Sequence, residues 1–127
     1  MPDSQRLLLA DADANVRAAL RLLLARHPRL QVVAEVENLE ELQRASSSLE
    51  LDLVLLDMDL RGLTADDLRA ICTRAATVVL STRDEHLQNA LDAGAAAFVC
   101  KSESPQHLLR VLQRVASAIA GSPQAAS

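Results

Sequence analysis

The chain has 127 residues, a length that fits a single domain with one hydrophobic core. Half of the residues are hydrophobic, but Phe98 is the only aromatic residue, so aliphatic side chains must build the core. The formal net charge of −4, together with the lack of any other aromatic residue, argues against a nucleic-acid-binding surface in this chain.

Five short apolar runs are predicted to form strands. Most of them are too continuous to leave one face in water, which is typical of strands buried on both faces of a parallel sheet. In chain order, these runs are residues 7–10, 31–36, 53–56, 77–80 and 96–100.

A helix is predicted after each of these runs. Apolar residues recur at helical spacing over 16–24 and over 108–119. Asn38 and Thr64 are each followed three residues later by an acidic residue, as in a capping box at the start of a helix. The serines at 46–48 are predicted to form an exposed loop. We expect the first helix to end at 27–28, the fourth to span 84–93 before Gly94, and the fifth to begin at 104–105.

Strict alternation of strands and helices predicts an α/β fold with a doubly wound, five-stranded parallel sheet. Parallel strands need crossover connections, and the helices of these crossovers cover both faces of the sheet. We expect residues 1–120 to form this domain. The small and polar residues at 121–127 are expected to be a flexible tail or the start of a linker.

Charged and hydroxyl side chains stand where four of the predicted strands end. Asp11 follows the first strand, Asp57 the third, Ser81 the fourth and Lys101 the fifth. Ligands of doubly wound folds bind at the carboxyl ends of the strands. Two carboxylates close together repel each other and attract a hard cation such as Mg²⁺ and the lysine ammonium. One such Asp alone is more often a solvated loop acid, but four such strand ends in order favour a site.

These strand ends resemble the receiver domain of bacterial two-component response regulators, over residues 5–120. The segments that carry the resemblance are LLLADADANVRAAL, LDLVLLDMDLRG, VVLST and AGAAAFVCKSESPQHLL. The segments KSESPQHLL and HPRLQVVAEVEN are similar to the NarL-type subclass, which is fused to a helix-turn-helix DNA-binding domain and regulates transcription; no such domain is present in these 127 residues. The resemblance implies a flavodoxin-like (βα)5 fold with strand order 2-1-3-4-5, in a cytoplasmic protein of phosphorelay signal transduction.

The resemblance also implies a role for each matching residue. Asp57 would accept a phosphoryl group from a histidine kinase or a phosphotransfer protein, as a carboxylate nucleophile. Asp11 and Asp57 would bind Mg²⁺ together with the backbone carbonyl of Asp59. Lys101 would hold the phosphoryl oxygens, and Ser81 would turn toward them.

Phe98 matches the aromatic switch residue of the family. A hydroxyl that moves toward the phosphate would leave a space that Phe98 can fill. A single Phe in an apolar strand is also often a simple core residue, so the sequence leaves both interpretations open.

The metal site departs from the family pattern at Ala12. The family usually has a second acid there, its direct metal ligand, and a methyl group cannot bind Mg²⁺. Asp13 either compensates, since residues two apart on a strand share a face, or caps the helix that follows. We therefore expect Mg²⁺ to bind weakly. Arg61 replaces a common proline of the family before Gly62, so the loop after Asp57 is expected to be less rigid.

Two functional hypotheses follow from the sequence. The first is a switch that is phosphorylated on Asp57. The second is a divergent receiver that acts as a protein-interaction module without phosphorylation. A metal-dependent phosphatase is the least favoured, because it would need a second catalytic acid on a cap domain, so we do not expect an enzyme.

The last helix is expected to support a weak homodimer. Leu109, Arg110, Val111 and Arg114 lie beside its core stripe, and members of the family pair through such faces.

The cysteines and histidines are expected to be structural or exposed. Cys72 and Cys100 lie in apolar stretches without CxxC spacing and are predicted to be reduced thiols. His27, His86 and His107 share no spacing with acidic residues and are predicted to lie at the surface. No signal sequence or apolar run of about twenty residues is present, so no membrane contact is expected.

Overall fold

The computed structural model of this protein describes residues 4–120, so the tail predicted at 121–127 lies outside the described residues. Five strands and five helices alternate along the chain. The strands are β1 (Gln5–Ala10), β2 (Leu30–Val36), β3 (Leu53–Asp57), β4 (Ala76–Ser81) and β5 (Ala97–Cys100). The helices are α1 (Ala14–Leu24), α2 (Leu39–Ser48), α3 (Ala65–Arg74), α4 (His86–Asp92) and α5 (Pro105–Ala120). No helix within the described residues is long and apolar enough to cross a membrane.

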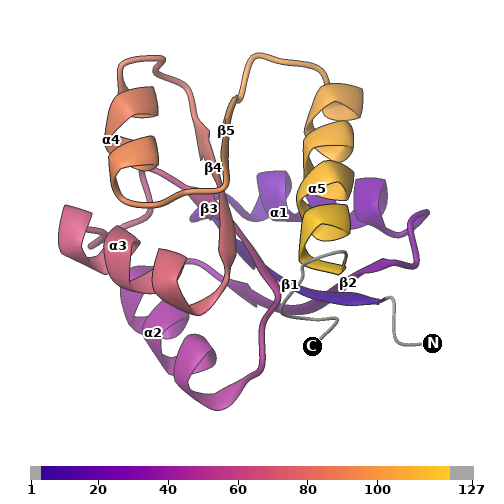
Figure 1. Cartoon of the computed structure of the whole chain (residues 1–127), viewed down its shortest axis with the longest axis horizontal. Helices are drawn as coiled ribbons and strands as arrows, with labels where there is room; N and C mark the ends of the chain where they lie inside the picture. The colour runs from indigo at the N-terminus through magenta and orange to yellow at the C-terminus, as the bar shows by residue number, and fades with distance from the viewer. Residues whose placement is uncertain (1–3, 121–127) are drawn as a thin grey trace.

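The strands form one parallel sheet in the order β2-β1-β3-β4-β5 (Figure 1). This confirms the predicted flavodoxin-like fold and strand order. β1 pairs with both β2 and β3, so the strand order reverses beside β1. Because all pairs are parallel, the carboxyl ends of the strands lie at one edge of the sheet, where doubly wound folds bind ligands.

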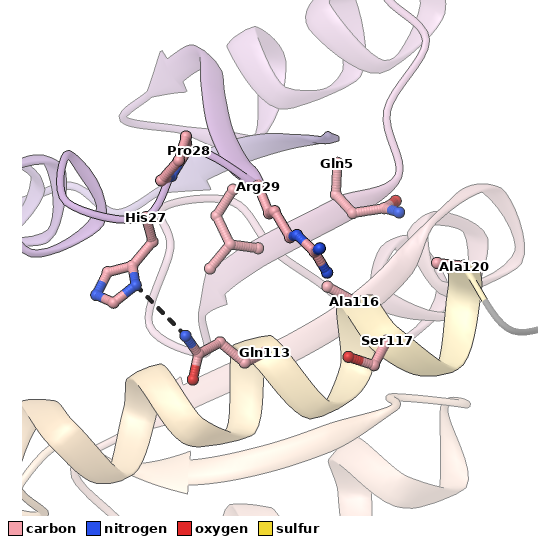
Figure 2. A pocket seen from close by; sticks show the side chains of 9 residues that line it. Gln5, His27, Pro28, Arg29, Gln113, Ala116, Ser117 and Ala120 are labelled. Carbon is pink, nitrogen blue, oxygen red and sulfur yellow. Dashed lines mark hydrogen bonds between the residues drawn. The ribbon is translucent and has the colours of Figure 1, made fainter. Parts of the chain in front are cut away.

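The helices cover both faces of the sheet, with α1 and α5 on one face and α2, α3 and α4 on the other (Figure 1). Beyond the end of α1, the His27 Nδ1 atom lies 3.4 Å from Gln113 Nε2 of α5 (Figure 2). A cavity of about 700 Å³ opens beside this contact and is also lined by Gln5, the first residue of β1. This cavity is therefore at the opposite end of β1 from Asp11.

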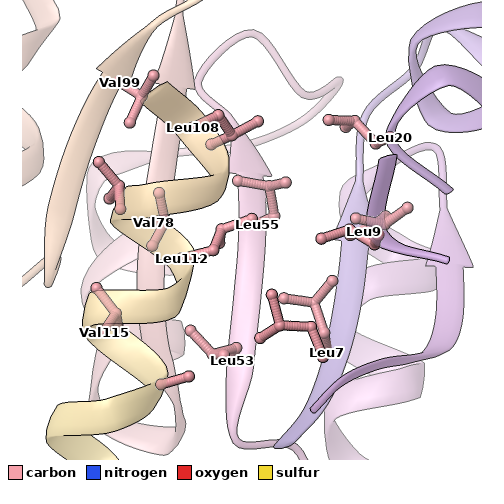
Figure 3. Close-up of a cluster of buried hydrophobic side chains, with 14 of the residues drawn as sticks. Leu7, Leu9, Leu20, Leu53, Leu55, Val78, Val99, Leu108, Leu112 and Val115 are labelled. Carbon is pink, nitrogen blue, oxygen red and sulfur yellow. The ribbon is translucent and has the colours of Figure 1, made fainter. Parts of the chain in front are cut away.

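Side chains along each strand alternate between two hydrophobic clusters. Leu7 and Leu9 pack under α1 and α5, where Leu112 of α5 is fully buried (Figure 3). Leu8 and Ala10 pack under α2, α3 and α4. Both faces are buried, which explains why the strands read as continuous apolar runs in the sequence.

The helix starts follow the predicted capping residues, with one difference. Thr64 and Asp67 form the predicted capping box of α3. Asn38 caps α2 by accepting a hydrogen bond from the Glu41 backbone N–H. The Glu41 carboxylate, however, accepts from the backbone N–H of Glu37 rather than from that of Asn38, so the reciprocal bond is displaced by one residue.

Three predicted boundaries were wrong. The first helix, α1, ends at Leu24 with Ala25 as its C-terminal cap, rather than at residues 27–28. The serines at 46–48 belong to α2 rather than to a loop. Their hydroxyls donate to carbonyl groups of the preceding turn, Ser47 to Gln43 at 2.8 Å and Ser48 to Arg44 at 2.9 Å. The fourth helix begins at His86 instead of residue 84, and its capping residue Glu85 makes no side-chain capping bond.

Candidate functional site

Three of the predicted site residues meet at the carboxyl edge of the sheet. Lys101 Nζ lies 3.0 Å from Asp11 Oδ2 and 3.2 Å from Asp57 Oδ2. The side chains of Asp11 and Asp57 are 3% and 7% exposed, and that of Lys101 is 23% exposed. We call these three residues the acid–lysine cluster. Its lysine ammonium neutralises part of the charge of two carboxylates that water reaches poorly.

Backbone groups fix both carboxylates in place. The N–H of Asp13 donates to Asp11 Oδ1 at 2.9 Å, and the N–H of Asp59 donates to Asp57 Oδ1 at 3.0 Å. Each carboxylate thus holds one backbone N–H on Oδ1 and the Lys101 ammonium on Oδ2. The chain can turn sharply after Asp57 because Gly62 has a φ of +90°, and a Cβ there would lie 3.3 Å from Leu39 Cβ.

The surroundings raise the pKa of both Asp57 and Lys101. Burial raises the pKa of the Asp57 carboxyl, and the charge of Asp11 raises it further, while the Asp59 N–H and Lys101 oppose this only in part. Burial alone would lower the pKa of Lys101, but the two carboxylates outweigh it, so that pKa is also raised. Lys101 is therefore held in its charged form beside Asp57.

We expect Asp57→Asn to raise the free energy of unfolding at neutral pH by an amount on the order of 1 kcal/mol, because it removes a carboxylate charge that burial disfavours. The folded-state pKa of Asp57 is raised, so the ionised carboxylate costs more in the folded chain than in the unfolded chain. The stabilising contribution of protonated Asp57 is fully present below the unfolded pKa, near 4, and is lost as the pH rises through the folded pKa.

Urea denaturation at a series of pH values tests whether Asp57→Asn raises the free energy of unfolding in this way. The stability gap between the Asn variant and wild type should open as the pH rises from about 4 and then stay constant. A gap that is independent of pH, or a less stable Asn variant at neutral pH, would show that Lys101 compensates the buried charge fully.

The donor set fits a divalent cation only in part. Within residues 4–120, no group of three acidic, His or Cys side chains converges as a metal site. Asp11 and Asp57 offer two carboxylates, and the side chain of Ala12 offers none. Asp13 caps α1, since its Oδ1 accepts from the Asn15 N–H at 2.8 Å. This geometry agrees with the capping alternative for Asp13.

The fourth predicted residue, Ser81, lies at the same edge, but its hydroxyl is not bonded to the carboxylates. The hydroxyl lies 2.7 Å from His86 Nδ1, accepts from the Arg83 N–H at 3.0 Å, and is 3.3 Å from the Arg83 carbonyl oxygen. The Ser81 side chain points toward α4 because residues two apart on a strand lie on the same face of the sheet. Val79, two residues before Ser81, packs on the face that α4 covers.

The prediction that His86 lies at the surface was wrong. His86 is half-buried and bonded to the candidate switch hydroxyl. No sequence pattern indicated this contact, because the conformation of residues 82–85 decides which side chain of α4 faces Ser81. The other two histidines are half-buried as well. The prediction that no histidine shares a spacing with an acidic residue was wrong for His107, whose Nε2 lies 3.3 Å from Oε1 of Glu103, four residues earlier in the chain.

Phe98 is half-buried and packs against the hydrophobic cluster under α2, α3 and α4. It pairs with Val79 in the sheet, so it lies on the same face as Ser81. This position is compatible with both interpretations of Phe98.

The face predicted for dimerisation is smaller than expected. Val111 is buried at 3% exposure, and Leu109 packs against the cluster under α1 and α5. Only Arg110 and Arg114 of the four predicted residues are exposed. The helical stripe that faces the sheet is thus wider than the sequence indicated.

Known proteins are similar to this chain in sequence and in fold. A family model described as the response regulator receiver domain matches residues 7–113. The nitrate/nitrite response regulator protein NarL of Escherichia coli K12 is 31% identical over 117 residues, which cover 87% of this chain and 54% of NarL. The protein-glutamate methylesterase/protein-glutamine glutaminase 2 of Cereibacter sphaeroides is 36% identical over 105 residues, which cover 76% of this chain and 28% of that protein.

Among solved structures, the signal receiver domain of a response regulator called NarL from Mycobacterium tuberculosis has a TM-score of 0.82 and 20% sequence identity. The match covers 91% of this chain and 98% of that chain. This likeness supports the fold. The chain spans about half the length of its Escherichia coli relative. On the family model and the NarL-type relatives together, the chain belongs to the response regulator receiver domain family.

Proposed function

We propose that this chain accepts a phosphoryl group on Asp57 from a histidine kinase or a phosphotransfer protein. The observation that carries the proposal is the buried Asp57 carboxylate at the end of β3, with Lys101 Nζ at 3.2 Å. The phosphoryl group is transferred to a carboxylate of the chain itself, so the chain acts as a signalling switch rather than as an enzyme.

In the transfer, an Asp57 oxygen attacks phosphorus while the bond from phosphorus to the donor imidazole nitrogen breaks. The imidazole leaves with the electron pair of that bond and takes a proton from water. Phosphoryl transfer depends on in-line positioning and on neutralising the phosphoryl oxygens. Lys101 provides one positive charge, and the Asp59 N–H keeps the Asp57 carboxylate oriented through Oδ1.

A bound Mg²⁺ would neutralise further negative charge on the phosphoryl oxygens. Asp11 and Asp57 are the residues that would hold it, together with the backbone carbonyl of Asp59. Asp13 contributes to this set only if it leaves its position at the start of α1. With only two carboxylates in place, we propose that the ion binds weakly.

The phosphorylated state would act through Ser81 and Phe98. Phosphorylation replaces a singly charged carboxylate with a group of about twice that charge. A hydroxyl that turns toward the new oxygens vacates space on the face that Phe98 shares, and Phe98 can move into it. The surface beside α4 and β5 would then differ between the two states.

Incubation with acetyl phosphate and Mg²⁺, followed by intact mass measurement, tests the proposal. We expect the mass of one phosphoryl group to be added per chain. A chain that gains no phosphoryl group at any Mg²⁺ concentration would instead be the interaction module.

We also propose a cytoplasmic location. Cys72 and Cys100 are unpaired within the described residues, which suits a reducing compartment.

We further propose a weak homodimer that pairs through α5. The exposed residues Arg110 and Arg114 of α5 leave little apolar surface for pairing, so the dimer should form only at high concentration. Sedimentation velocity with and without acetyl phosphate measures this, and a monomer under both conditions at high concentration contradicts it.

A further inference from the structure

The Ser81 hydroxyl is held by the turn between β4 and α4 rather than by the acid–lysine cluster. Ser81 is fully buried. Its shortest hydrogen bond joins Oγ to His86 Nδ1 at 2.7 Å, and its other two partners are the N–H and carbonyl of Arg83. A buried hydroxyl with three partners has a strong preference for one orientation.

His86 is the first residue of α4, so the bond between Ser81 and His86 also links the start of that helix to the end of β4. Glu85, the residue that precedes it, makes no side-chain capping bond, and α4 has only seven residues. Short helices without a cap are marginal, and tertiary contacts must hold them. Within the described residues, His86 provides α4 with a side-chain hydrogen bond to the end of β4.

We propose that His86 is a positioning residue that holds the Ser81 hydroxyl away from Asp57 until phosphorylation, and that loss of the Ser81–His86 bond then loosens the start of α4. The proposal rests on the phosphorylation of Asp57 proposed above. It adds a residue that links the hydroxyl to the helix.

A side-chain rotation that brings the Ser81 hydroxyl to a phosphoryl group would replace its bond to His86. Rotation of Ser81 from one staggered rotamer to another moves Oγ by roughly 2 Å, which breaks a 2.7 Å contact. This holds whether His86 Nδ1 accepts from the hydroxyl or donates to it. In this proposal the hydroxyl therefore leaves His86 when it turns toward a phosphoryl group on Asp57.

Loss of the bond between Ser81 and His86 would also change the surface of the protein. His86 also lines a cavity of about 440 Å³ between α3 and α4, together with Asp59, Arg69 and Asn89. A change in the imidazole position alters the wall of this cavity. The bond between Ser81 and His86 thus connects the interior of the site with a surface that a partner could contact.

Three variants test the proposal, and each is measured by amide hydrogen exchange over residues 86–92 and by the lifetime of the phosphoryl group. His86→Ala should raise exchange in α4 of the unphosphorylated chain to the level of phosphorylated wild type. It should also lengthen the lifetime of the phosphoryl group roughly three- to tenfold, because no bond to His86 competes for the hydroxyl. His86→Asn places an oxygen near the position of Nδ1 and should restore both properties. Leu91→Ala, at a side chain of α4 that is 46% exposed, is the control that should change neither.

Combination with Ser81→Ala separates this role from a general effect on the helix. In the Ser81→Ala background, His86→Ala should have no further effect on exchange or on phosphoryl lifetime. Additive effects there, or unchanged α4 exchange in phosphorylated wild type, would overturn the proposal. If wild type gains no phosphoryl group, the proposed function and the release step both fail, while exchange in the unphosphorylated variants still decides whether His86 holds α4.

Discussion

Asp57→Asn is expected to abolish phosphoryl uptake from acetyl phosphate. The substitution removes the negative charge and the nucleophilic oxygen while keeping the size and planar shape of the side chain. Asp57 is the only carboxylate that ends the central strand β3, and it is one of two that contact Lys101. Intact mass measurement should show no added phosphoryl group after a reaction time that saturates wild type.

The control for this variant is Asp66→Asn. The Asp66 side chain is 93% exposed on α3 and takes no part in the acid–lysine cluster, so the change should leave uptake as in wild type. If Asp57→Asn still gains a phosphoryl group that is stable in acid and labile in base, the acceptor is another residue. The stability measurement proposed above shows whether the Asn variant is folded.

Ala12→Asp is expected to strengthen Mg²⁺ binding roughly tenfold to a hundredfold and to speed phosphorylation of Asp57. A third carboxylate adds one oxygen ligand and a Coulomb attraction of a few kcal/mol before desolvation is subtracted, at the effective dielectric near a protein surface. Ala12 is exposed, so a longer side chain can be accommodated. Wild type is expected to bind Mg²⁺ at millimolar concentrations or more weakly, a rough estimate from the missing ligand.

The matched variant is Asp13→Ala, followed in the same Mg²⁺ titration by amide chemical shifts. Asp13 caps α1, so its loss should destabilise the chain by about 1 kcal/mol without changing Mg²⁺ affinity. If wild type binds Mg²⁺ tightly and Asp13→Ala alone removes that binding, Asp13 has replaced the missing ligand and the site is complete without Ala12→Asp.

The fold could be predicted almost completely from the sequence, because each strand is a separate apolar run and the alternation of strands and helices allows few topologies. The meeting of Asp11, Asp57 and Lys101 followed from the same topology, since parallel strands place their carboxyl ends together. Residues that directly follow buried strands are therefore predictable site residues in such a fold.

The contacts that depend on loop and helix rotation could not be predicted. The partner of Ser81 is set by the conformation of residues 82–85, which carry no strong turn signal. Val111 is buried because the stripe of α5 that faces the sheet is wider than a single row of residues at helical spacing. The serines at 46–48 satisfy carbonyls of their own helix, an alternative to a loop that composition alone does not distinguish.

The most direct test of the central claim is to locate the phosphoryl group in the wild-type chain. After reaction with acetyl phosphate, borohydride reduction converts an aspartyl phosphate into a stable homoserine. Trypsin should then release residues 45–61, which contain Asp52, Asp57 and Asp59, and fragmentation of this peptide assigns the site. We predict homoserine at position 57 and at no other position. Homoserine in residues 7–17, which contain Asp11 and Asp13, or a phosphoryl group on a histidine or serine, would contradict the assignment of Asp57 as the acceptor.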